Sequence, residues 1–291
     1  MLLGALEAGG TKMVCALGDE NGEILERASF PTREQEPTIA DIVGFFRGRG
    51  IEALGVSCFG PLDLNEDSPT YGNITTTPKP GWRDAPLRAR LMEALGVPVG
   101  IDTDVNGAAL GEALLGAGRG LDSLVYYTIG TGIGGGYYYR GMLLHGLVHP
   151  EMGHVLMRPH PQDPAPHGFC PYHDGCLEGL ACGKAMEKRW GVPARELAPE
   201  HIAWTIEAEY LAQMCVSTIL TLSPERIVLG GGVMHQLHLF PMVRRRTLEM
   251  LGGYVAHPSV LERIDEYIVP PALGDNSGAK GSLLLAVRAL G

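Results

Sequence analysis

The sequence has no long apolar run and no excess of positive charge. No hydrophobic stretch approaches the ~20 residues needed to cross a bilayer, and the opening segment MLLGALEAGG lacks the basic start of a signal peptide. The formal net charge is −10, whereas a protein that binds the phosphate backbone of nucleic acid normally presents a basic face. These absences predict a cytoplasmic protein with no membrane or nucleic-acid partner.

Cysteine is also scarce, with 6 residues in 291. In a cytoplasmic protein the thiols stay reduced, so two of them close together indicate a metal site more than a disulfide. In the segment CPYHDGC, Cys170, His173 and Cys176 follow one another at two-residue gaps. Zinc takes four Cys or His ligands in a tetrahedron, and the nearby candidates for the fourth are His154 and His160. The alternative is a histidine-rich surface loop with two buried thiols.

Two common nucleotide motifs are absent. The sequence has no Walker motif, and GTGIGGG (130–136) is not a dinucleotide fingerprint because a strand hairpin is predicted after it, not a helix. Glycine is abundant instead, with 41 residues, about twice the usual ~7% share. Glycine turns let backbone amides approach phosphate oxygens without side-chain interference. One such cluster alone would indicate a plain turn, but clusters at 9–10, 130–136 and 230–232 together predict a nucleotide site.

Strand and helix signals alternate along the chain, which is typical of an α/β fold. Strands are predicted at 2–8, 13–19, 23–30, 52–59 and 97–103, with helices near 38–49, 84–95 and 105–118. Prolines 78 and 80 exclude regular structure from the loop at 71–82. The pattern restarts with strands from 123, from 136 and from 142, helices near 180–190, 199–222, 237–251 and 277–289, and strands at 224–230 and 265–270. This duplication predicts two similar units that face each other across a cleft.

Eight segments together resemble the ROK family of sugar kinases, and within it the bacterial fructokinase branch. They are LEAGGTK, GPLD, TPKPGW, DTDVNGAALGE, YYTIGTGIGGG, HPEMGH, CPYHDGCLEGLACG and IVLGGGV. The resemblance implies a duplicated actin/hexokinase-like (ribonuclease H-like) α/β fold. We expect a first domain at 1–105, with a helix at 276–291 packing back on it. The second domain is expected at 106–275, with the zinc loop at 149–178.

The resemblance also implies an activity, that of a fructokinase (ATP:hexose 6-phosphotransferase) that makes fructose 6-phosphate and ADP. Mg-ATP would be the donor, zinc a structural cofactor, and the protein a homodimer. The nearest alternative is a kinase for mannose, glucose or N-acetylmannosamine. A sugar-responsive repressor would need a helix-turn-helix before the hairpin at residue 6, where we expect no room for one. A non-catalytic sugar sensor is a further alternative, although the catalytic aspartate and both phosphate turns are intact.

The residues expected to hold the nucleotide lie in or near the glycine turns. They are Glu7, Gly9, Gly10, Thr11, Lys12, Gly130, Thr131, Gly132, Gly134, Lys184, Gly230, Gly231 and Gly232. Thr11 and Thr131 add hydroxyl donors. At the position of Glu7 the wider family usually has Asp, whereas the fructokinase branch shares the Glu. The resemblance links this position to the way in which the water shell of Mg²⁺ is held.

Phosphoryl transfer requires a clamped donor, an acceptor hydroxyl aimed in line, and a group that takes the hydroxyl proton. Asp102 and Asp104 lie where a predicted strand meets a predicted helix, which is where α/β ligand sites collect. The spacing leaves either one as the base, and it is equally compatible with Asp104 as a helix N-cap. The resemblance selects Asp104, in the segment DVN, as the catalytic aspartate.

The sugar candidates flank the zinc loop. The resemblance assigns Glu151, His154 and Glu178 to sugar hydroxyls, and His154 to the zinc as well. Weaker candidates for the sugar are Asn106, Gly60, Pro61 and Asn73; Gly60-Pro61 is also compatible with a plain turn, and Asn73 with ordering its own loop.

The metal set predicted in this way is His154, Cys170, His173 and Cys176. Since metal binding energy converts into local order, zinc would hold the loop that carries the sugar-recognising carboxylates. The remaining histidines of the segment are expected to face solvent or to lie just outside the ligand set; they are His149, His160 and His167.

Overall fold

The computed structural model describes residues 1–77 and 79–291, so the prediction for Pro78 lies outside the described residues. The chain divides into two compact units. The first comprises residues 1–120, 136–150 and 275–291, and the second comprises residues 121–135 and 151–274. The domain limits expected at 105 and 275 stay a prediction.

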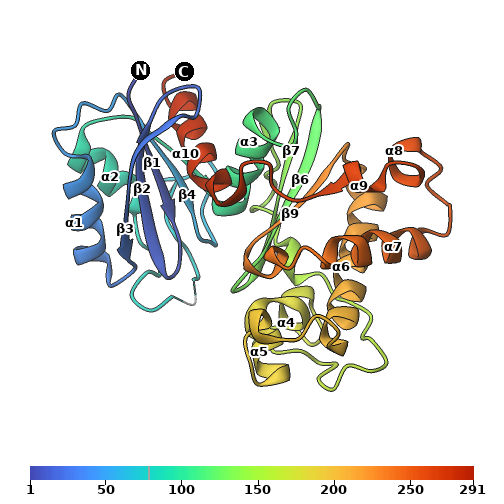
Figure 1. The fold of residues 1–291 in the computed structure, drawn as a ribbon. Coiled ribbons are helices and arrows are strands. Elements are labelled where there is room, and N and C mark those ends of the chain that lie inside the picture. Colours follow the sequence, from blue (N-terminus) through green and yellow to red (C-terminus); the bar gives the residue numbers. More distant parts are fainter. Residues whose placement is uncertain (78) are drawn as a thin grey trace. The chain divides into compact units, whose positions relative to one another are not determined.

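The first sheet has the strand order β3-β2-β1-β4-β5 (Figure 1). An antiparallel meander is followed by two parallel strands. The strands are β1 (Leu3–Ala8), β2 (Lys12–Gly18), β3 (Ile24–Pro31), β4 (Leu54–Cys58) and β5 (Val99–Thr103). Successive side chains of a strand point to opposite faces, so Leu6 of β1 joins the core under α1 and α2 while Ala5 joins the core under α10.

In the described part of the chain, four helices cover this sheet. They are α1 (Gln35–Phe46), α2 (Leu87–Leu95), α3 (Asp104–Leu115) and α10 (Ser277–Arg288). Glycine lets α10 lie directly on the sheet, because a Cβ at Gly55 would be 1.7 Å from the carbonyl oxygen of Ser282. A Cβ at Gly281 would likewise be 1.7 Å from the carbonyl oxygen of Gly107, so α3 and α10 also meet backbone to backbone.

The second sheet repeats the first. Its order is β10-β9-β6-β7-β8, which matches the first sheet when β6 to β10 stand for β1 to β5. The strands are β6 (Ser123–Ile129), β7 (Ile133–Tyr139), β8 (Met142–Leu143), β9 (Ile227–Gly230) and β10 (Ile268–Val269). Residues 136–150, which include the end of β7 and all of β8, group with the first unit. The predicted duplication and the α/β class are confirmed.

The helices of the second unit follow β7 in the chain. They are α4 (Leu177–Ala181), α5 (Gly183–Trp190), α6 (Ile202–Leu222), α7 (Leu239–Leu251), α8 (Pro258–Leu261) and α9 (Ile264–Tyr267). Short 3₁₀ turns occur at Met152–His154, Ala194–Glu196, Gly232–His235 and Gly274–Asn276. Among the helices that the structure describes, none is both long enough and apolar enough to span a membrane.

One predicted strand differs from the structure. The strand expected at 265–270 is a helical turn, α9, followed by only two strand residues. The hydroxyl of Tyr267 donates to the carbonyl of Pro224 at 2.8 Å, a tertiary contact that sequence periodicity does not report. The short helix α4, which begins directly after Cys176, was not predicted.

Candidate functional site

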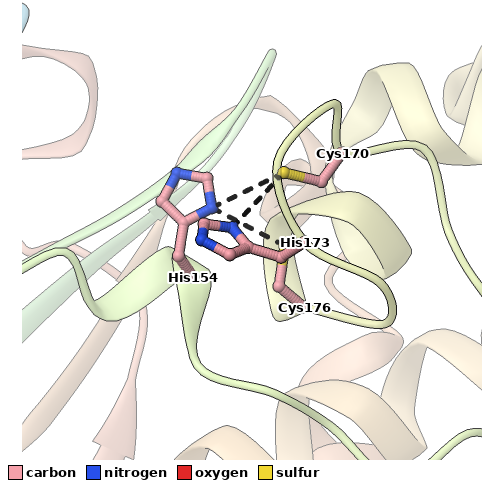
Figure 2. Close-up of side chains that lie close together, drawn as sticks. All are labelled: His154, Cys170, His173 and Cys176. Carbon is pink, nitrogen blue, oxygen red and sulfur yellow. Dashed lines mark hydrogen bonds between the residues drawn. The ribbon is translucent and has the colours of Figure 1, made fainter.

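The four predicted metal ligands lie together in the second unit (Figure 2). One ligand atom from each of them lies within 4.8 Å of the others. Nδ1 of His154 is 3.8 Å from Sγ of Cys170 and 3.6 Å from Sγ of Cys176, and Nδ1 of His173 is 3.6 Å from Sγ of Cys170. Zinc bonds of ~2.0–2.3 Å give tetrahedral edges of about 3.3–3.8 Å. The three N–S separations match such edges, so this group of two thiols and two imidazoles suits one zinc ion.

His160, the other candidate for a fourth ligand, lies outside this cluster. Its backbone N–H donates to the hydroxyl of Tyr210 at 3.1 Å, and its ring nitrogen accepts from the N–H of Gln162 at 3.1 Å. His167 pairs with Asp174 at 2.8 Å on the surface. The geometry therefore places His154, and not His160, beside Cys170, His173 and Cys176, the four residues called the metal cluster below because together they could hold a metal ion.

Local sequence explains how the cluster forms. Gly175 has φ +71°, a conformation that glycine adopts readily and that turns the chain back toward Cys176. Sγ of Cys176 caps α4 by accepting from the N–H of Gly179 at 3.4 Å. Gly179 also leaves room for Cys170, because a Cβ there would be 2.9 Å from the Cys170 Cβ. The two cysteines and the start of α4 are thus packed as one small unit.

A buried charge cluster anchors the same loop at a second point, which the sequence did not suggest. The carboxylate of Asp163 lies 2.8 Å from Nε of Arg189 on α5, and both side chains are almost fully buried. The hydroxyl of Tyr210 on α6 donates to the other carboxylate oxygen at 2.7 Å. Next to them, burial raises the pKa of Glu207 well above its usual range. Breaking a buried pair leaves an uncompensated charge, so this cluster ties the loop firmly to α5 and α6.

Two glycine turns and a helix start meet in the second unit. The turn Gly130–Gly132 follows β6 and the turn Gly230–Gly232 follows its parallel neighbour β9. They are so close that a Cβ at Gly231, which has φ +88°, would be 2.5 Å from the carbonyl oxygen of Ile129. The first residue of α5, Gly183, donates its N–H to the carbonyl of Gly130 at 2.7 Å. A helix start and glycine turns offer backbone N–H groups and a positive dipole end to phosphate.

The other nucleotide candidates of the second unit lie in or next to these turns and the start of α5. Thr131 and Lys184 are exposed, and Gly134 lies at the start of β7. Lys184 is the second residue of α5, one position after the contact with Gly130. Within the second unit, the structure therefore brings together all the nucleotide candidates that the sequence placed there.

The first glycine turn belongs to the first unit. It joins β1 to β2, with the N–H of Gly9 donating to the carbonyl of Lys12 at 3.0 Å, and Gly10, Thr11 and Lys12 are exposed. Beside it, the carboxylate of Glu7 rests on the first turn of α10, where a Cβ at Gly278 would be 2.9 Å from the Glu7 Cδ. Gly278 thus leaves room for a side chain one methylene longer than Asp.

The Glu7 carboxylate is poorly satisfied. Among the described residues, its buried Oε2 has no hydrogen-bond partner. Burial raises the pKa of Glu7, against the lowering effect of Arg27 and Lys12. A shielded carboxylate oxygen without a partner suits a hard cation or its water shell.

The two aspartates at the start of α3 have different environments. Asp102 is buried, and its Oδ1 accepts from the N–H of Thr103 at 2.7 Å and from Nδ2 of Asn106 at 2.8 Å. Its Oδ2 lies 2.9 Å from Nε2 of His145. The N-cap of α3 is Thr103, whose hydroxyl accepts from the N–H of Asn106 at 3.2 Å. Asp104 is therefore the first helical residue and not the N-cap, and it is only half-buried.

His145, which was not predicted, pairs with the buried Asp102 and has a raised pKa. The hydrogen bond to Asp102 raises the pKa of His145; burial opposes the shift, and the Asp102 charge adds to it. A group whose pKa rises on folding stabilises the fold below its unfolded pKa, about 6.5, and loses that contribution as the pH rises through the folded-state pKa.

We therefore expect His145→Gln to lower the melting temperature most below about pH 6.5, with a smaller difference from wild type above that pH. Thermal unfolding of both proteins from about pH 5.5 to about pH 8.5 measures this. A difference that grows as the pH rises would contradict the assignment.

The weaker sugar candidates of the first unit lie on paired loops. The carbonyl of Pro61 accepts from the N–H of Thr75 at 2.8 Å, and the carbonyl of Asn73 accepts from the N–H of Asp63 at 3.0 Å. His149 packs against Gly60, is buried, and accepts from the N–H of Leu62 at 3.1 Å. It does not face solvent, and it braces the Gly60-Pro61 loop.

The stronger sugar candidates belong to the second unit. Glu151 precedes the 3₁₀ turn Met152–His154, and its carbonyl accepts from the N–H of His154 at 3.0 Å. Oε1 of Glu178 is 3.9 Å from Nε2 of His154. The two ring nitrogens of His154 thus serve different neighbours, with Nδ1 toward the cysteines and Nε2 toward Glu178.

A duplicated α/β fold with glycine turns after the equivalent strands β1 and β6, and an aspartate at the start of α3, has the features of the actin/hexokinase-like fold. The chain belongs to the ROK family, whose profile matches residues 3–289. It is 47% identical to a putative fructokinase of Bacillus subtilis, over 99% of this chain and 96% of that protein. It is 43% identical to a fructokinase of Pediococcus pentosaceus, over 100% of this chain and 99% of that one.

Solved structures agree with this fold. A ROK hexokinase from Thermus thermophilus superposes with a TM-score of 0.81 at 30% identity, covering 100% of this chain and 99% of that one. A ROK family glucokinase from Streptomyces griseus, in complex with glucose and AMPPNP, gives a TM-score of 0.80 at 24% identity, covering 99% and 100% of the two chains.

Proposed function

We propose that this chain is an ATP-dependent fructokinase, which transfers the γ-phosphoryl group of Mg-ATP to the 6-hydroxyl of D-fructose. The choice of fructose rests on sequence identity, which is higher to relatives named fructokinase than to relatives named glucokinase. Four proteins named fructokinase and one named putative fructokinase are 40–47% identical over 97–100% of this chain. Relatives named glucokinase are 29–32% identical over 62–78% of it.

The nucleotide would be held by backbone groups. The turns at Gly130–Gly132 and Gly230–Gly232 and the start of α5 would contact phosphate oxygens, and the exposed Lys12 and Lys184 would balance their charge. Mg²⁺ bound with ATP neutralises charge that develops on the phosphates. The unpartnered Oε2 of Glu7 supports a place for this ion or its waters beside the first glycine turn.

Asp104 would accept the proton of the 6-hydroxyl. The sugar oxygen forms its bond to the γ-phosphorus as the bond to ADP breaks, and the proton passes to the Asp104 carboxylate. Burial supports this choice, because Asp104 is half-buried whereas Asp102 is buried and bonded to Thr103, Asn106 and His145. Asp102 would instead hold the start of α3 in place.

The sugar would be recognised by carboxylates and polar groups from several segments. The proposed main contacts are Glu151, His154 and Glu178. Smaller contributions would come from Asn106, Gly60, Pro61 and Asn73. A site built from fixed hydrogen-bonding groups rejects sugars that leave those groups unpaired.

Zinc would be structural. Four protein ligands complete a tetrahedron and leave no open position for a water molecule, so the ion would order the loop at 149–178 rather than activate a nucleophile. We also propose, from the family resemblance, that the protein is a homodimer, which sedimentation of the purified protein would test.

The proposed function predicts a ranking of acceptors. Fructose should give the highest kcat/KM, by about tenfold or more over glucose and N-acetylmannosamine, with mannose second. ADP release measured over a panel of hexoses checks this. A preference for glucose or N-acetylmannosamine would overturn the choice of sugar but spare the kinase, and no ADP release with any hexose would overturn both.

A further inference from the structure

The segment after Cys176 holds the turn Gly130–Gly132 at both ends. Oε2 of Glu178 accepts a hydrogen bond from the N–H of Ile133 at 2.9 Å. Five residues later, the N–H of Gly183 donates to the carbonyl of Gly130 at 2.7 Å. The turn is closed internally by the N–H of Gly130, which donates to the carbonyl of Gly132 at 2.9 Å.

The Glu178 carboxylate lies directly against this turn. A Cβ at Gly132 would be 2.5 Å from Glu178 Oε2, closer than real atoms approach. Because Glu178 occupies the N–H of Ile133, phosphate contacts are left to the N–H groups nearer the tip, those of Thr131 and Gly132. A turn binds an anion only while its N–H groups converge on one point. The hydrogen bond from Ile133 to Glu178 fixes one end of the turn, so the orientation of the Thr131 and Gly132 N–H groups depends on it.

The other end of this arrangement is the metal cluster. Glu178 lies on α4, a helix of five residues that begins directly after Cys176 and is capped by the sulfur of that residue. A helix this short is not stable by itself, so its anchors decide its position. Oε1 of Glu178 also faces Nε2 of His154 at 3.9 Å, and the other nitrogen of that ring is within the metal cluster.

We propose that Glu178 is a positioning residue for the phosphate-binding turn, and that α4 couples the metal cluster to nucleotide affinity. This rests on the proposed function, because it takes the turn at Gly130–Gly132 to bind the phosphates of ATP. It extends that function, since the metal then supports the donor site as well as the sugar loop. Glu178 thereby links the donor turn and the proposed acceptor contacts through its two oxygens.

The test measures nucleotide binding without sugar. Titration calorimetry of the full-length, zinc-loaded protein with β,γ-imido-ATP and Mg²⁺ gives the Kd of wild type and three variants. Glu178→Ala should raise the Kd roughly five- to tenfold, the usual worth of one hydrogen bond. Glu178→Gln keeps an acceptor oxygen and should stay within about twofold of wild type. Glu187→Ala, a change at an exposed carboxylate on α5, is the matched control and should bind as wild type.

A second arm leaves the sequence unchanged. Chelation of the metal from wild-type protein should weaken binding of the same analogue by at least the same factor, and added zinc should restore it. This arm decides the matter if Glu178→Ala does not fold, as judged by circular dichroism. The proposal is overturned if Glu178→Ala binds like wild type, if Glu178→Gln is as weak as Glu178→Ala, or if the metal-free protein keeps full affinity. Wild type that does not bind the analogue at all would overturn the proposed function itself.

Discussion

Asp104→Asn is expected to lower kcat by roughly 10²–10⁴, the usual size of a general-base contribution. The amide has almost the same shape as the carboxylate but cannot take the proton of the sugar hydroxyl. The KM for fructose should change by less than about threefold, because an interaction made mainly in the transition state affects kcat more than binding. Initial rates of ADP release at varied fructose and saturating ATP give both constants.

Two other aspartates of the first unit supply comparisons for this experiment. Asp67→Asn changes an exposed aspartate of the same unit and should leave both constants unchanged. Asp102→Asn should also reduce kcat, but through the position of α3 and not through loss of the base. The change weakens the bonds to Thr103, Asn106 and His145 that fix the start of this helix. If Asp104→Asn turned over like wild type while Asp102→Asn did not, the base would have to be reassigned to Asp102.

Features that depend on neighbouring residues could be predicted from the sequence. The two meanders appear as repeated strand and turn signals, and the sheets have matching strand orders. The Cys-x2-His-x2-Cys spacing brings three ligand atoms together because Gly175 and the cap at Cys176 act within a few residues. The glycine turns follow β1, β6 and β9 because each strand ends where glycine permits a tight turn.

Features that depend on distant residues could not be predicted. His145 and Asp102 are 43 residues apart, and Glu178 and Ile133 are 45 apart. The pairing of Asp163 with Arg189 likewise exists only once the loop lies on α5 and α6. In each case tertiary packing decides which two groups come into contact. A single polar side chain in the sequence does not indicate which distant group it will contact. The same limit explains α9, since the anchor for Tyr267 is a carbonyl in another segment.

Loss of the metal is expected to have the other large effect. Structural zinc sites contribute apparent binding energies of about 10–16 kcal/mol, which equals or exceeds the whole stability of a typical domain, about 5–15 kcal/mol. His173→Gln removes one of the four clustered ligands (Figure 2). We expect the variant to lose bound zinc and at least about a hundredfold in kcat/KM for fructose, because the loop that bears Glu151 and Glu178 loses its anchor.

A histidine six residues earlier provides the matched control. His167 lies on the same loop, is exposed and pairs with Asp174 outside the metal cluster, so His167→Gln should keep both zinc and activity. Elemental analysis of wild type should find about one zinc per chain, as one four-ligand set implies. Cys170→Ser should behave like His173→Gln, since a neutral hydroxyl replaces a thiolate poorly. Purified wild-type protein with full activity and no bound metal would show that packing alone, through Asp163 and Arg189, is enough to order this loop.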